Sequence, residues 1–178
     1  NGRKIVGAFG TLSPHQGVIE LIKLIQHSNA DKFFFVIGGP LKMESFSTKE
    51  QEFINDFINN LPENCHLKLD YLQEGAEFNT FVNDVDILYI VYNNFPSASN
   101  RLTKAAIFKK TVLSSKRFCV GEDVTKYNLG YTVTEGNINE YIAGLDECAK
   151  HVFNDSDFED YATLHTKEFL LKKFEQLM

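Results

Sequence analysis

Basic side chains, cysteines and long apolar runs are all scarce in this sequence. Its 18 Lys and Arg residues are outnumbered by 24 Asp and Glu. The resulting net charge of -6 does not supply the basic face that nucleic-acid phosphates require. No apolar run approaches the roughly 18–20 residues of a membrane span, and the first residues lack a signal-peptide pattern. We therefore expect a cytoplasmic protein that does not bind nucleic acid.

The three cysteines are too few and too far apart to form a recognisable site. Cys65, Cys119 and Cys148 are odd in number and widely spaced, which fits neither a disulfide framework nor a Cys-x-x-Cys metal or redox motif. We expect all three to be reduced packing residues, since free cysteine is commonly buried.

Motifs for the common catalytic machineries are also absent from the sequence. The serines lack a Gly-x-Ser-x-Gly turn, the five histidines lack metal-ligand spacing, and no glycine run precedes Lys-Ser or Lys-Thr. These gaps argue against a nucleophile elbow, a metal centre and a Walker loop. We therefore expect no metal and no cofactor, and the motifs identify no catalytic residue.

What the sequence does contain is one domain's worth of alternating strands and helices. Its 178 residues fit a single domain, residues 1–178, since domains usually hold roughly 100–200 residues. Ser47 and Glu50 form a capping box before one of the helices. The apolar patterns predict strands over residues 4–9, 33–37, 65–69, 86–92, 111–115 and 130–134, and helices over 18–25, 47–60, 76–83, 100–108, 138–153 and 157–177.

This alternation predicts an α/β fold, a doubly wound, Rossmann-like parallel sheet of about six strands with helices on both faces. In such folds ligands bind beyond the carboxyl ends of the strands, where the strand order reverses. We expect an open crevice between the ends of the first and fourth strands.

Four segments in this order resemble a known family. Residues 7–18 are similar to its first strand and loop, residues 36–40 to its Val-Gly-x-Gly strand ending, and residues 128–131 to a later strand. Residues 99–113 give the most specific match, to a Pro-Asn-Lys-Leu-x-Glu-x-x-Ala-x-Gly-Lys-Pro-Val-Ile block. The family is the group 1 glycosyltransferases of GT-B fold, and the resemblance is to their C-terminal, donor-binding domain.

The resemblance implies half of a glycosyltransferase of the kind used in polysaccharide biosynthesis. This domain would bind a nucleoside diphosphate sugar as substrate and be inactive alone. A missing N-terminal domain would supply the acceptor site. Any peripheral association with a membrane would occur through that domain.

The resemblance, together with the chemistry of phosphate binding, implies a donor site. Gly10, Thr11 and the helix start at Asn100 offer backbone N–H groups to phosphates. Asn100 would cap its helix while Arg101 projects a cation toward the diphosphate. The nucleobase would lie beside the residues after the third strand, including Glu74. The predicted donor-binding residues are Gly10, Thr11, His15, Gln16, Gly38, Gly39, Leu72, Gln73, Asn100, Arg101, Leu102 and Lys104.

The sequence departs from the family's pattern at four positions. Thr11 and Gln16 stand where the family has a phosphate-contacting Arg and Lys. Pro96 and Lys104 stand in place of paired glutamates, the second of which usually accepts hydrogen bonds from the donor ribose. An ammonium group only donates, so Lys104 cannot repeat that role.

The loss of two cations leaves two interpretations of the remaining ones. Arg101, Lys104, Lys109 and Lys110 could form a phosphate-binding cluster, or the three lysines could be a solvated helix end that offsets the helix dipole. His15 could supply a further charge or be a neutral loop histidine.

The departures also keep two other functions open. One is a degenerate transferase domain that has lost donor chemistry and serves as a scaffold or ligand sensor. The other is an unrelated flavodoxin-like or nucleotide-binding module, although the Gly-x-Gly-x-x-Gly fingerprint is missing after the first strand.

Overall fold

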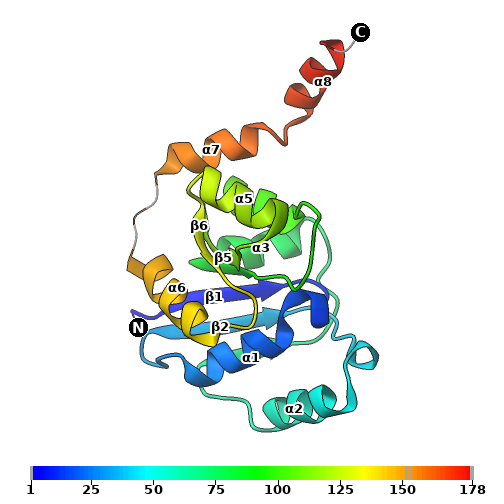
Figure 1. The fold of residues 1–178 in the computed structure, drawn as a ribbon, viewed down its shortest axis with the longest axis vertical. Helices are drawn as coiled ribbons and strands as arrows, with labels where there is room; N and C mark the ends of the chain where they lie inside the picture. The colour runs from blue at the N-terminus through cyan, green and yellow to red at the C-terminus, as the bar shows by residue number, and fades with distance from the viewer. Residues whose placement is uncertain (1, 151, 153, 177–178) are drawn as a thin grey trace.

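A computed structural model of the chain describes residues 2–150, 152 and 154–176. It contains one sheet of six parallel strands, in the order β3-β2-β1-β4-β5-β6 (Figure 1). The predicted fold class is confirmed, and the order reverses between β1 and β4. The strands are β1 (Lys4–Phe9), β2 (Phe33–Gly38), β3 (Cys65–Lys68), β4 (Ile87–Ile90), β5 (Thr111–Ser115) and β6 (Gly130–Val133).

Helices cover both faces of the sheet. One face packs against α1 (Val18–His27), α2 (Thr48–Asn59) and α6 (Ile138–Lys150), and the other against α3 (Ala76–Asn83), α4 (Asn100–Ile107), α5 (Phe118–Lys126) and α7 (Asp155–Thr163). Helix α8 (Lys167–Glu175) extends away from this body (Figure 1). Two 3-10 turns, η1 (Pro14–Gln16) and η2 (Met43–Ser45), lie in the loops after β1 and β2.

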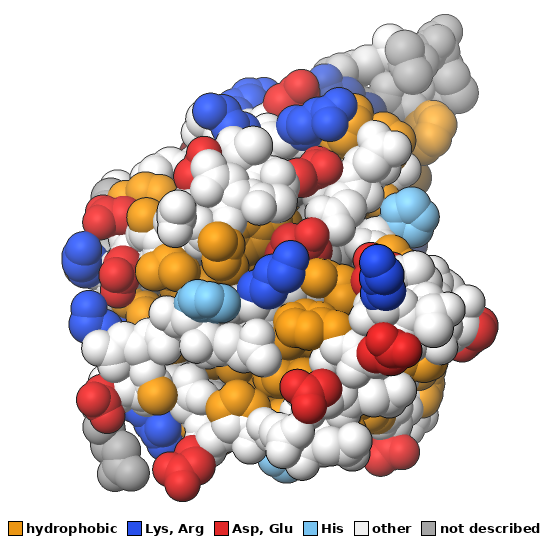
Figure 2. Space-filling model, turned by 60° about the horizontal axis from the view of Figure 1, so that its bottom comes forward, with side chains coloured by type: hydrophobic (Ala, Val, Ile, Leu, Met, Phe, Trp, Pro, Cys, Tyr) orange, Lys and Arg blue, Asp and Glu red, His pale blue; other side chains and the backbone are white. Residues whose placement is uncertain are grey.

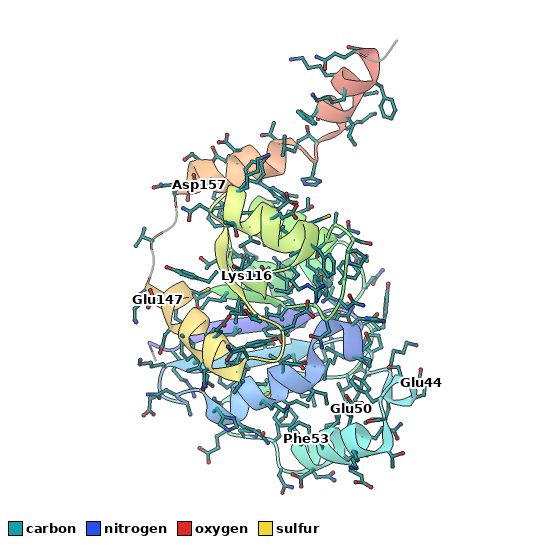
Figure 3. The ribbon with its side chains drawn as sticks, viewed as in Figure 1. Glu44, Glu50, Phe53, Lys116, Glu147 and Asp157 are labelled. Carbon is teal, nitrogen blue, oxygen red and sulfur yellow. The ribbon has the colours of Figure 1, made fainter. Side chains whose placement is uncertain are left out.

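The alternation of side chains along each strand builds one hydrophobic core on each face. In β1, Val6 and Ala8 belong to the core beneath α1, whereas Phe9 belongs to the core beneath α4. All four residues of β4 are buried, as expected for a central parallel strand covered on both sides. Phe53 of α2 packs against the core beneath α1 (Figure 3).

Several predicted boundaries need correction. Strand β4 ends at Ile90, so Tyr92 leaves the ladder. Helix α5 was not predicted, because Gly121 interrupts its short apolar pattern. A side chain at Gly121 would collide with the carbonyls of Ser115 and Lys116, so the glycine allows the helix to pack tightly. The predicted helix ends at residues 153 and 177 lie outside the described residues.

The predicted helix over residues 157–177 is two helices. Helix α7 ends at Thr163, and Thr166 begins α8 as its N-cap, with its hydroxyl accepting a hydrogen bond from the Phe169 N–H at 3.2 Å. The capping box at the start of α2 is confirmed, since the Ser47 N–H donates to Glu50 at 2.8 Å.

The cysteine prediction is right for two residues and wrong for the third. Cys65 and Cys148 are buried, and burial raises the pKa of each thiol to about 12. Cys119 is exposed near the start of α5.

The molecular surface mixes charges of both signs. Acidic and basic side chains are interspersed on the face seen in Figure 2.

Within the described ranges, none of the helices has the length and apolar character needed to cross a bilayer.

Candidate functional site

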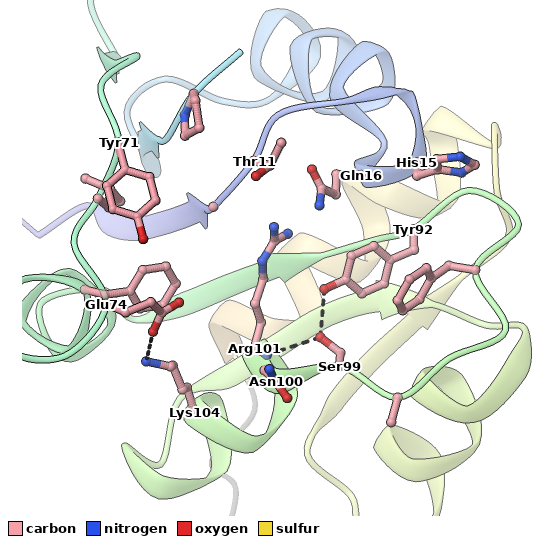
Figure 4. Close-up of a pocket in the computed structure, with 16 residues that line it drawn as sticks. Thr11, His15, Gln16, Tyr71, Glu74, Tyr92, Ser99, Asn100, Arg101 and Lys104 are labelled. Atoms are coloured by element: carbon pink, nitrogen blue, oxygen red, sulfur yellow. Dashed lines mark hydrogen bonds and ion pairs between the residues drawn. The ribbon is translucent and has the colours of Figure 1, made fainter. Parts of the chain in front are cut away.

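A cavity of about 380 Å³ lies where the strand order reverses. Its walls come from the loops that follow β1, β2, β3 and β4, from the first turns of α4 and from Phe78 of α3 (Figure 4). This is the predicted edge of the sheet. The lining residues are Gly10, Thr11, His15, Gln16, Pro40, Tyr71, Leu72, Glu74, Phe78, Tyr92, Phe95, Ala98, Ser99, Asn100, Arg101 and Lys104.

Eight of the twelve predicted site residues line this cavity, and four do not. Leu102 is fully buried in the core beneath α4. Gly38 packs against Leu72 and Phe9, and Gln73 uses its backbone N–H to donate to Glu77 at 2.9 Å. The fourth, Gly39, does not line the cavity but lies against the backbone of Gly10, which does. The eight that line it are Gly10, Thr11, His15, Gln16, Leu72, Asn100, Arg101 and Lys104.

Gly39 allows the loops after β1 and β2 to run in contact. Its φ of 134° is in the region that favours glycine, and a side chain there would collide with the backbone of Gly10. Beyond this contact the Leu12 N–H donates to the Pro40 carbonyl at 2.9 Å. The close approach holds Thr11 at the cavity wall.

Arg101 reaches across the cavity from the start of α4. A Cβ added to Gly10 would lie only 2.5 Å from Arg101 Nη2, so the guanidinium lies directly over the end of β1. The N-cap of α4 is Ser99, not Asn100 as predicted, because the Ser99 hydroxyl accepts from the Arg101 N–H at 3.2 Å. None of the ion pairs among the described residues involves Arg101.

Aromatic side chains that the sequence analysis did not identify form much of the wall. The ring centroids of Tyr92 and Phe95 are 4.6 Å apart, and Arg101 Cζ lies 5.7 Å from the Tyr92 ring. The Tyr92 hydroxyl also hydrogen-bonds to Ser99 at 2.7 Å. Tyr71 is 69% exposed at the opposite wall (Figure 4). Tyr71 follows β3, and Tyr92 and Phe95 follow β4. This placement at the carboxyl ends of strands could have identified them as site residues.

Lys104 is held by the loop and helix that follow β3. Its ammonium lies 3.0 Å from Glu74 Oε2, 3.1 Å from Asn79 Oδ1 and 4.5 Å from the Phe78 ring centroid. The side chain is 22% exposed. Lys104 therefore enters the cavity already neutralised, and Glu74 brings a carboxylate into the wall.

The two lysines that follow α4, Lys109 and Lys110, do not line the cavity, so the four-cation cluster is wrong. Lys109 donates to Asp155 and Glu159 of α7, each at 2.7 Å, and these bonds raise its pKa. Lys110 donates to the Asn83 carbonyl at 2.6 Å. Lys109 thus connects the segment after α4 to α7, and Lys110 connects it to the end of α3.

His15 and Gln16 lie in η1 at the far side of the cavity from Glu74 (Figure 4). His15 Nδ1 is 3.3 Å from the Asn93 carbonyl. A carbonyl oxygen only accepts, so this contact requires a proton on Nδ1. Nε2 of the neutral ring is then an acceptor.

The loop that carries Tyr71 and Glu74 is anchored at its base. Glu77 accepts from Lys68 and from the Gln73 N–H, both at 2.9 Å. The Lys68 hydrogen bond, followed by the Gln73 one, lowers the pKa of this carboxyl below its usual range. The anchor fixes where the loop enters the cavity.

The cavity has a small positive bias. Arg101 and Lys104 oppose the single carboxylate of Glu74, which leaves one net positive charge before His15 is considered. In the part of the chain that the structure describes, no three His, Cys, Asp or Glu side chains are grouped so that they could hold a metal ion. The chemistry available is anion binding, aromatic stacking and hydrogen bonding.

Structural comparison finds glycosyltransferases over nearly the whole chain. HepE of Anabaena in complex with UDP has a TM-score of 0.74 and 16% identity, covering 99% of this chain and 49% of HepE. A glycosyltransferase of Rickettsia africae has a TM-score of 0.73 and 13% identity, covering 99% and 47%. The C-terminal domain of the group 1 glycosyl transferase LpcC of Francisella tularensis has a TM-score of 0.66 and 16% identity, covering 90% and 86%.

By sequence, no protein-family model and no curated protein matches the chain. The chain spans about half the length of HepE and of the Rickettsia protein, but 86% of the separate LpcC domain. At these identities the likeness establishes the fold. The chain therefore has the α/β, Rossmann-like fold of the C-terminal domains of group 1 GT-B glycosyltransferases.

Proposed function

We propose that this chain is the donor-binding half of a glycosyltransferase, which transfers a sugar from a nucleoside diphosphate sugar to a glycan or another acceptor. A further, N-terminal domain would provide the acceptor site. The observation that carries the proposal is Arg101, which extends over Gly10 into the cavity without a carboxylate partner.

The cavity suits the parts of a nucleoside diphosphate. A guanidinium can bind phosphate oxygens in a bidentate manner, and phosphate contacts strengthen as the glycosidic bond loosens and charge builds on the departing diphosphate. Tyr71 is exposed at the wall and could stack on a base. The UDP complexes of HepE, which shares the fold, are consistent with such a ligand.

Calorimetric titration with UDP, GDP, ADP and FMN tests the proposal. We expect UDP or GDP to bind best, and Arg101→Ala to weaken that binding about 10- to 100-fold, the range for hydrogen bonds to charged groups. Lys49→Ala, which removes an exposed cation on α2, is the control and should leave the affinity unchanged.

A non-catalytic scaffold or ligand sensor remains the second candidate. Thr11 and Gln16 bring no charge to the cavity, and Lys104 is already paired with Glu74. Silence toward all four nucleotides would favour this function and contradict the first. A preference for FMN would instead indicate a flavodoxin-like module.

A further inference from the structure

Glu74 is the one carboxylate among the residues that line the cavity. Its side chain is 68% exposed, and its Oε2 accepts from Lys104 at 3.0 Å. Among the described residues no hydrogen bond involves Oε1 of Glu74. A carboxylate held at one oxygen and open at the other is a ready acceptor for hydroxyl groups.

The position of this carboxylate relative to Arg101 defines a direction in the cavity. Lys104 follows Arg101 by three residues and lies on the same side of α4, about one helical turn or roughly 5 Å further along. Figure 4 shows Arg101 between His15 on one side and the Glu74–Lys104 pair on the other. The cavity thus has an anion-binding centre with a hydroxyl acceptor on one side of it.

A nucleotide bound at Arg101 would follow this direction. The ribose lies between the phosphates, which are attached through its 5′ carbon, and the base, which is attached to its 1′ carbon. If the phosphates bind Arg101 and the base lies toward Tyr71, which projects from the same loop as Glu74, the ribose would lie beside Glu74.

We propose that Glu74, positioned by Lys104, accepts hydrogen bonds from the ribose hydroxyls and makes this site specific for nucleotides that carry them. The acceptor comes from the loop after β3, while the lysine on α4 holds it in place. This inference rests on the proposed function, because it needs a nucleoside diphosphate in the cavity.

The test compares each nucleotide with its counterpart that lacks both hydroxyls. UDP and GDP, and their 2′,3′-dideoxy analogues, are titrated into the 178-residue chain and into Glu74→Ala. In the wild type we expect the ribonucleotide to bind about tenfold or more tightly than the dideoxy analogue, because charge-assisted hydrogen bonds are strong. In Glu74→Ala this ratio should fall to near one.

Asp70→Ala is the matched control, since Asp70 is an exposed carboxylate of the same loop that does not line the cavity. It should keep the wild-type ratio. Equal ratios in the wild type and Glu74→Ala, no preference in the wild type, or an equal loss in Asp70→Ala would each overturn the role of Glu74 while leaving nucleotide binding intact. Absence of any nucleotide binding to the wild type would overturn the proposed function, and this inference with it.

Discussion

Helix α4 is flanked by cations in opposite situations. At its N-terminal end Arg101 projects into a cavity and makes no ion pair among the described residues, whereas Lys109, two residues past its C-terminal end, contacts two carboxylates of α7. Lys104, between them, faces the cavity but is paired with Glu74. A cation near a cavity indicates ligand binding only when the fold has not already neutralised it.

Leu102 was expected to contact the donor, but it is fully buried. Leu102→Ala should lower the free energy of unfolding by about 2–5 kcal/mol, because it leaves a void in the core beneath α4. The folded variant should bind nucleotide as the wild type does. Urea denaturation and titration separate the two effects, and a loss of affinity without a loss of stability would contradict the assignment of Leu102 to the core.

The sequence allowed the sheet to be predicted because each buried strand is a short apolar run that ends in turn residues. It also located Gly10, Arg101 and Lys104 in the cavity, because Gly10 follows β1 and the other two lie in α4, and these places follow from the order of the elements. Tyr92 and Tyr71 were missed, since their inclusion depends on the paths of two loops. The partners of Lys109 could not be predicted either. They lie on α7, and Asp155 is 46 residues further along the chain.

Arg101→Lys sharpens the comparison by keeping the charge and changing its shape. A lysine cannot make the planar, two-pronged contact of a guanidinium with phosphate, so we expect nucleotide affinity to fall about tenfold. Stability should change little, since Arg101 makes no ion pair among the described residues. The same affinity for both proteins in calorimetry would show that a point charge suffices at this position.

His15 should contribute one hydrogen bond to the bound ligand. With Nδ1 directed at the Asn93 carbonyl, Nε2 is left to hydrogen-bond a group of the nucleotide sugar. We expect His15→Ala to weaken binding about 2- to 10-fold in calorimetry, the range of a single hydrogen bond.

His15→Gln is the matched variant, because its side-chain amide can still form a hydrogen bond and should keep most of the affinity. If His15→Ala binds the nucleotide sugar as tightly as the wild type does, His15 merely lines the wall.

The smallest effect is expected at Lys109, just past the C-terminal end of α4. Lys109→Ala should shift the urea midpoint slightly downward and leave nucleotide affinity unchanged, because its partners Asp155 and Glu159 are largely exposed and Phe158 and Tyr161 of α7 stay buried. The difference from wild type should shrink in 1 M salt, where charges are screened within about 3 Å.

The pH dependence of that small difference follows from the raised pKa of Lys109, caused first by its bond to Asp155. A raised lysine pKa means that the stabilisation is present at neutral pH and is lost only as the pH rises through that value, above the ordinary lysine range. Comparison of urea midpoints for wild type and Lys109→Ala at pH 7 and pH 9 should therefore give the same difference. If Lys109→Ala weakened nucleotide binding as Arg101→Ala does, the two ends of α4 would act together, and the contrast between a free cation and a paired one would not explain the site.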